Sequence, residues 1–367
     1  MAAVLPEDRA DLLYHAYDGG GVEVTGPSLL VRKGLGQSVS AYANYYVDSV
    51  SSASVDVVTT ASAYGEERTE TSIGVDYLRD RTIMSLSRTT SEETDYEASS
   101  LHFNISQDVF GDLTTISMGY SRGEDNVYRN IGVGGARVRD PTFGEEVDRQ
   151  QYRIGVSQIL TKDLIVSLNF ESITDEGYLN NPYRSVRYLD AGSPTGFSYE
   201  PERYPNTRSS DALALRGRYF LPYRAAIYGE YRKYKDTWGI KADTYEFGYV
   251  HPLGERWILE ASYRHYDQNA ADFYSDLFPY SNAQNYLARD KELSTFSSQT
   301  IGVKASYQIA NKGWAAIDQF SVSLALDHIE FEYDDFRDLT QLTGTAGTEP
   351  LYGFTANVLQ FYVSIWY

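Results

Sequence analysis

The sequence has 367 residues and contains no cysteine. It also lacks any apolar run of about 18 residues, which is the minimum for a membrane-spanning helix. The missing cysteines exclude a disulfide-linked scaffold. Basic residues are in deficit, with 32 lysines and arginines against 51 aspartates and glutamates and a net charge of -19. Because nucleic-acid phosphates attract clustered lysine and arginine, this balance argues against a nucleic-acid partner.

The first residues, MAAVLPEDRADLLYH, form no hydrophobic export signal. An exported protein needs such a signal. We therefore expect either that the numbering begins at the mature chain with an added methionine, or that a signal precedes this sequence.

The sequence is instead rich in short stretches whose apolar residues alternate with polar ones. Tyr152, Ile154 and Val156 lead to the turn LTKD, and Leu164, Val166 and Leu168 follow it. Strand side chains point alternately to opposite faces, so a period of two predicts strands with one apolar face. Similar pairs recur along the chain, and tyrosine, with 33 copies, is dense near their ends. Aromatic rings with a polar tip are typical of the membrane interface.

The last stretch, LQFYVSIWY, places five apolar or aromatic side chains on one face of an extended chain. They are Leu359, Phe361, Val363, Ile365 and Tyr367. An ending of this kind is typical of the closing strand of a bacterial outer-membrane β-barrel. We expect it to act as the assembly signal for the barrel-assembly machinery.

The connections between the predicted strands alternate between short turns and longer polar stretches. The long ones cover 125–146, 174–207, 268–296 and 334–351. Outer-membrane barrels have short periplasmic turns and long external loops. Fifteen strands are readable from residue 21 onward, and the expected even number makes Asp11 to Tyr17 the missing one. We predict one all-β domain over 1–367, which forms a transmembrane antiparallel up-and-down barrel. The predicted number of strands is 16, with 14 as the alternative. Residues 1–20 are either the first strand or an N-terminal extension into the lumen or periplasm. Its location is the outer membrane, in contact with lipid and lipopolysaccharide.

If the apolar face contacts lipid, the opposite face carries the functional chemistry. The predicted inward charges are Arg153, Arg216, Arg218, Arg224, Glu230, Arg232, Glu246, Glu260 and Arg264. Unpaired charges are too costly for a dry core, so the lumen is either hydrated or cross-linked by ion pairs. Two interpretations stay open: a pore whose selectivity depends on these charges, or a scaffold with a plugged lumen. Loops 174–207 and 268–296 are rich in Tyr, Pro, Arg and Asp, and we expect them to be ordered. They are the candidates for a ligand or partner surface.

An enzyme is the weakest hypothesis, and no catalytic residue is assigned. His102, Asn104 and Ser106 share a face, but at about 6.6 Å spacing along one strand they cannot form a triad. A group of acidic residues near the external rim, Glu332, Asp334, Asp335 and Asp338, is a weak candidate for a divalent cation. No cofactor is otherwise predicted.

Several distinctive stretches resemble a Gram-negative outer-membrane barrel family of unknown function. They are DLLYHAYDGGGVEVTGPSLLVRKG, YYVDSVSSASVDVVTTASAYGEERTE, DVFGDLTTISMGYSRG, DEGYLNNPYRSVRY and DFYSDLFPYSNAQNYLARDKELSTF. The resemblance implies the barrel fold and the outer membrane, and it supplies no catalytic residue. Genes of that family often neighbour a small lipoprotein, a thioredoxin-like protein and a flavin transferase. By resemblance only, a small lipoprotein partner is expected.

Overall fold

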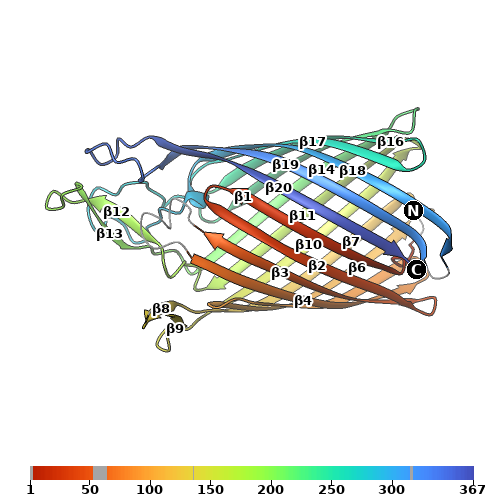
Figure 1. Ribbon diagram of the computed structural model, residues 1–367, viewed down its shortest axis with the longest axis horizontal. Helices are drawn as coiled ribbons and strands as arrows, with labels where there is room; N and C mark the ends of the chain where they lie inside the picture. The colour runs from red at the N-terminus through yellow and green to blue at the C-terminus, as the bar shows by residue number, and fades with distance from the viewer. Residues whose placement is uncertain (1–2, 53–63, 135, 315–316) are drawn as a thin grey trace.

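The chain forms one closed barrel of antiparallel strands, seen in a computed structural model that describes residues 3–52, 64–134, 136–314 and 317–367 (Figure 1). Residues 55–63 of the stretch VDVVTTASAYGEERTE lie outside the described residues. The barrel strands are β1 (Arg9–Gly19), β2 (Val22–Leu35), β3 (Val39–Ser52), β4 (Tyr64–Arg79), β5 (Thr82–Glu92), β6 (Tyr96–Val109), β7 (Thr114–Val127), β10 (Glu145–Thr161), β11 (Leu164–Gly177), β14 (Thr207–Phe220), β15 (Ala226–Asp236), β16 (Lys241–Leu253), β17 (Trp257–Gln268), β18 (Phe296–Trp314), β19 (Ile317–Arg337) and β20 (Leu351–Trp366). The predicted number of 16 is confirmed.

The barrel closes where the first strand pairs with the last. β1 is hydrogen-bonded to β20 in a continuous register from Arg9↔Trp366 to Gly19↔Ala356. The predicted first strand at Asp11 to Tyr17 therefore exists and is longer at both ends. Tyr367, the residue after β20, is also bonded to β2, because its hydroxyl donates a hydrogen bond to the Arg32 carbonyl at 3.1 Å.

Large apolar side chains cover one face of the strands, as the alternation predicts. Tyr152 and Ile154 on β10 are 51% and 52% exposed. The outward apolar side chains on the neighbouring strands, such as Met118 and Leu168, are exposed to a similar degree. A soluble protein does not expose a continuous apolar band of this size. The band is the lipid-facing surface expected of a membrane barrel.

The connections differ between the two ends of the barrel. The chain termini and short turns such as 162–163 lie at one end. The long connections gather at the other and carry two small hairpins, β8 (Asn130–Val133) with β9 (Ala136–Arg139) and β12 (Ser185–Leu189) with β13 (Phe197–Pro201) (Figure 1). One 3₁₀ turn, η1 (Lys291–Leu293), lies in the loop after β17. Loop asymmetry is thus confirmed, which makes the end with the long loops the external one.

The apolar alternation on β19 changes phase at Asp327–His328 without a bulge. β18 and β19 stay in register from Phe296↔Tyr333 to Ala310↔Gln319. Beyond Leu326 the outward side chains become His328, Glu330 and Glu332. The strand therefore leaves the apolar band at this point. Among the described residues, no helix has the length and apolar character needed to cross a membrane.

Candidate functional site

All but one of the predicted inward charges lie on strands β10 to β17, at positions that alternate with the apolar outer residues. Arg216, for example, follows Leu215, which is half exposed on the outer face. Alternation places the arginine on the opposite, concave face. By the same parity Arg153, Arg218, Glu230, Arg232, Glu246, Glu260 and Arg264 face inward.

Contacts between strands that are not neighbours show that this face is concave. Arg232 on β15 reaches Glu171 on β11 at 3.2 Å, across the intervening β14. The Tyr228 hydroxyl on β15 likewise donates to Glu260 on β17 at 3.0 Å. Alternate strands are about 10 Å apart, so only converging side chains on the inside of a curved wall meet in this way.

The inner charges are partly paired. Glu171 accepts hydrogen bonds from Arg153 at 2.9 Å and from Arg232 at 3.2 Å, so two guanidinium groups share one carboxylate. Arg216 lies 3.9 Å from Glu230. Among the described residues, no carboxylate lies within 4.0 Å of Arg218 or Arg264, whose guanidinium groups instead lie over Tyr228 and Tyr266.

Arg224 is the exception, and its predicted strand position is wrong. β15 begins at Ala226, and Arg224 sits in the preceding turn with a φ of 69°. Its guanidinium lies 3.5 Å from the Gly254 carbonyl of the next turn at the same end. This φ lies in the left-handed region, which is typical of turns. Because Arg224 lies in a turn, it belongs to the rim of the barrel and not to its inner wall.

Three external loops pack together into a lid, which we define as residues 178–206, 269–295 and 338–350. Two small apolar clusters stabilise it. Tyr204 and Phe273 of the lid pack against Trp238, at the tip between β15 and β16. Val186, Phe278 and Leu287 form the second cluster, entirely within the lid. The prediction that these long loops are ordered fits this packing.

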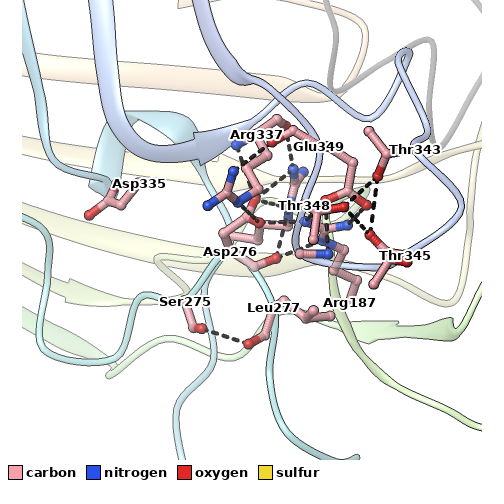
Figure 2. A network of polar contacts seen from close by, with 12 residues as sticks. Arg187, Ser275, Asp276, Leu277, Asp335, Arg337, Thr343, Thr345, Thr348 and Glu349 are labelled. Carbon is pink, nitrogen blue, oxygen red and sulfur yellow. Dashed lines mark hydrogen bonds and ion pairs between the residues drawn. The ribbon is translucent and has the colours of Figure 1, made fainter.

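The lid loops are tied together by five charged residues, which we call the lock: Arg187, Asp276, Arg289, Arg337 and Glu349. Figure 2 labels all of them except Arg289. The Arg187 side chain is fully buried and donates to both carboxylate oxygens of Glu349, at 2.8 and 3.1 Å. It also pairs with Asp276 and donates to that residue's carbonyl at 2.9 Å. Arg289 adds a contact of 2.9 Å to Asp276, and the Arg337 side chain donates to the Glu349 carbonyl. The lock therefore joins all three loops and the end of β19.

The lid crosses the barrel mouth. Tyr183 donates to Asp95, in the turn between β5 and β6. Four residues further on, Arg187 pairs with Glu349, in the loop between β19 and β20. In the order of the closed wall, β6 and β19 lie on nearly opposite sides. Loop 178–206 thus contacts both sides of the mouth.

A cavity of about 460 Å³ lies where the lid meets the inner wall. Its walls come from both parts. Arg149, Asp175, Arg208 and Arg232 lie on barrel strands, and Tyr204, Asp290 and Leu293 lie in the lid. A smaller cavity of about 300 Å³ lies along the wall beside Arg153, Glu171 and Arg232. Of the charges predicted from the sequence, Arg232 therefore lines both cavities and Arg153 lines the smaller one.

One lid carboxyl has a shifted pKa. Burial raises the pKa of Glu202 to about 7, and the nearby negative charge of Asp290 adds to the shift. The Tyr204 hydroxyl donates to Glu202 at 2.6 Å, and the backbone N–H of Arg289 donates at 2.7 Å. Glu202 is therefore close to half ionised near neutral pH, inside the apolar packing of the lid.

The acidic residues predicted for a cation are not brought together. Glu332 and Asp334 point outward, whereas Asp335 accepts from the backbone N–H of Thr295 and Asp338 from that of Thr340. Within the described ranges, the acidic group whose oxygens lie within 4.8 Å of one another is a different one, Glu66, Glu93 and Asp95.

His102 lies on the inner wall between two serines. Its Nδ1 is 2.8 Å from Ser121 Oγ, and its Nε2 is 3.0 Å from Ser100 Oγ. Both ring nitrogens are thus satisfied by hydroxyls, and in the part of the chain that the structure describes no carboxylate bonds to the ring as a catalytic triad requires.

Comparison with known proteins agrees with this architecture. The profile of a family described as "Protein of unknown function (DUF3570)" matches residues 57–361. The chain belongs to this family. No protein of curated function matches the sequence.

Solved structures with a similar fold are outer-membrane proteins. A bacterial polysaccharide outer membrane secretin is 9% identical, with 99% of this chain and 100% of that chain covered and a TM-score of 0.52. The siderophore receptor PirA from Acinetobacter baumannii is 9% identical, with 99% and 60% covered and a TM-score of 0.46. A loop L8 deletion mutant of OmpT from Vibrio cholerae is 9% identical, with 98% of each chain covered and a TM-score of 0.44. At 9% identity the likeness to the secretin concerns the fold alone, which is that of an outer-membrane β-barrel.

Proposed function

We propose that this DUF3570 member is an outer-membrane pore for polar solutes whose external mouth is closed by the lid. The observation that carries the proposal is the inner wall of β10 to β17, where Arg153, Arg216 and Arg232 face Glu171 and Glu230. Charges of both signs on a concave wall favour a hydrated lumen, because burial in a dry one costs several kcal/mol per ion. A barrel of 16 strands is wide enough for an aqueous channel.

In this proposal the lid is the gate. Loop 178–206 contacts both sides of the mouth, and the lock holds it against loops 269–295 and 338–350. A solute that enters from outside then passes only if the lock opens or if a narrow path beside the lock admits it. Removing Arg187 unties the loops without touching the barrel wall.

Single-channel recording in planar bilayers tests the proposal. We expect small or infrequent current steps from the native barrel and larger, more frequent ones from Arg187→Leu. Arg81→Ala is the matched control, because it removes an exposed arginine from a turn at the far end. If correctly folded native and Arg187→Leu barrels both fail to conduct, the pore proposal is wrong.

A second candidate is a scaffold that holds a partner such as a small lipoprotein on a permanently closed lid. The buried Arg187–Glu349 pair favours it, since a gate that opens often would have to re-hydrate both charges. Copurification from native membranes tests this alternative. A barrel that is repeatedly isolated alone and conducts ions excludes the scaffold role.

A further inference from the structure

The cavity between the lid and the inner wall has the lining of a small-molecule site. Its volume of about 460 Å³ lies within the range of ligand pockets, roughly 300–1,000 Å³. It combines half-buried aromatic side chains, Tyr234 and Tyr266, with charged and amide groups such as Arg149, Asp175 and Gln268. We propose that this cavity binds an uncharged, hydroxyl-rich ligand of the sugar class. The inference deepens the proposed pore function, because it names the class of solute.

The charge balance of the lining excludes ions as the preferred ligands. Three arginines, Arg149, Arg208 and Arg232, contribute to the cavity, as do three acids, Asp175, Asp290 and Glu292. Most of these charges are already matched. Arg149 lies 2.8 Å from Asp175, Arg208 lies 2.7 Å from Asp236, and Asp290 pairs with Arg184. An anion would meet the carboxylates and a cation the guanidinium groups, so neither sign gains a net attraction.

The polarity of the lining also excludes an apolar ligand. Guanidinium, carboxylate and amide groups next to a hydrocarbon would lose their bound water and gain no hydrogen bond in its place, which disfavours binding. A sugar offers many hydroxyls, each of which donates and accepts. Its C–H faces suit the aromatic rings of Tyr234 and Tyr266. The ligand class that satisfies both kinds of surface is therefore neutral and polyhydroxylated.

The lining is fixed before any ligand arrives. Gln268 donates to the carbonyls of Glu292 at 2.9 Å and Ser294 at 2.8 Å, which ties β17 to the lid. The Tyr266 hydroxyl donates to Gln268 at 2.6 Å, and Arg208 lies over the Trp238 ring at 4.6 Å. Side chains held in this way lose little further freedom on binding, which favours affinity.

Isothermal titration calorimetry on the full chain tests the site, in an amine-oxide detergent that carries no sugar headgroup. The probes are glucose and maltose, with citrate as anion and putrescine as cation. We expect saturable binding of at least one sugar, and affinities for citrate and putrescine at least tenfold lower. Tyr266→Ala should weaken sugar binding at least tenfold, whereas Tyr362→Ala, an inner-wall tyrosine outside the cavity, should leave it within twofold.

Several results would overturn the inference. They are tighter binding of citrate or putrescine, equal losses in Tyr266→Ala and Tyr362→Ala, or no sugar binding by either the native barrel or Arg187→Leu, whose lid is untied. The last comparison separates a missing site from a blocked entrance. A barrel that binds sugar but never conducts contradicts only the pore, and one that conducts without binding contradicts only this site.

Discussion

Arg187 and Glu349 are 162 residues apart in the chain, yet form a two-bond ion pair with side chains 0% and 1% exposed. The pair links the loop that follows β11 to the loop that follows β19, and six strands of the wall, β14 to β19, lie between the two loops. A buried pair of this kind contributes little when intact, but is costly to break from one side, because the remaining charge stays buried. Such a contact specifies one arrangement of the lid.

Removing one partner of this pair should therefore loosen the lid. We expect Arg187→Leu to destabilise it by about 3–5 kcal/mol, since Glu349 is left buried and unpaired. Chymotrypsin should then cleave loop 269–295 while the barrel keeps its heat-dependent gel mobility. The double variant Arg187→Leu/Glu349→Leu should recover part of the resistance. Resistance equal to that of Arg81→Ala would show that the lock does not hold the lid.

The lid should also weaken as the pH rises, because of Glu202. Its pKa of about 7 in the folded lid lies above the ordinary value of 4.5, so protonation favours the folded state. The contribution of protonated Glu202 to the stability of the lid is fully present below pH 4.5. It is lost as the pH rises through 7, and the loss is on the order of 3 kcal/mol. Hydrogen exchange of the lid amides at pH 5.5 and pH 8 measures this. Glu202→Gln should flatten the difference, and an unchanged slope would contradict the assignment.

Gly248 on β16 leaves room for the Tyr228 ring on the inner wall. A Cβ at Gly248 would lie 2.1 Å from that ring, and the ring's hydroxyl bonds Glu260. We expect Gly248→Ala to lower the free energy of unfolding in urea by about 1–3 kcal/mol through overpacking. Gly217→Ala is the control, because nothing lies within 4 Å of its added Cβ. Equal stability of the two variants would mean that Tyr228 does not pack there.

The wall of the barrel was predictable from the sequence because its signal is local. A period of two decides which residues face lipid, so Leu215 and Arg216 could be assigned to opposite faces without any coordinates. The even strand number of such barrels then pointed to β1. Arg224 was misplaced because alternation cannot show where a strand starts, and the left-handed turn residue is not a glycine.

The lid was only partly predictable, because its contacts connect distant loops. The long loops 174–207 and 268–296 were recognised as ordered, and they contain Arg187, Asp276 and Arg289. Their pairing with Glu349 has no sequence signature, since an arginine in a loop is usually solvated. The weak cation candidate rested on acidic residues that are close in sequence, such as Glu332 and Asp334. On a strand, residues two apart share a face but lie about 6.6 Å from each other, and these two point outward.

Charge reversal on the inner wall should change ion selectivity if solutes pass there. Arg218 suits this test because, among the described residues, no carboxylate lies within 4.0 Å of its guanidinium, so Arg218→Glu breaks no ion pair. We expect the ratio of cation to anion permeability to rise roughly twofold, read from the reversal potential in a salt gradient. Lys162→Glu, in an exposed turn at the same end, is the control. Equal shifts in both variants would place the current path away from Arg218.

The most direct test of the account is whether water reaches the inner wall. The chain has no cysteine, so single cysteines can be introduced at neighbouring positions of β14, A214C facing inward and L215C facing lipid. A membrane-impermeant sulfonated maleimide is added to the barrel in liposomes. A hydrated, charged lumen predicts fast labelling of A214C and little labelling of L215C. An unreactive A214C in the folded barrel, or faster labelling of L215C, would contradict it.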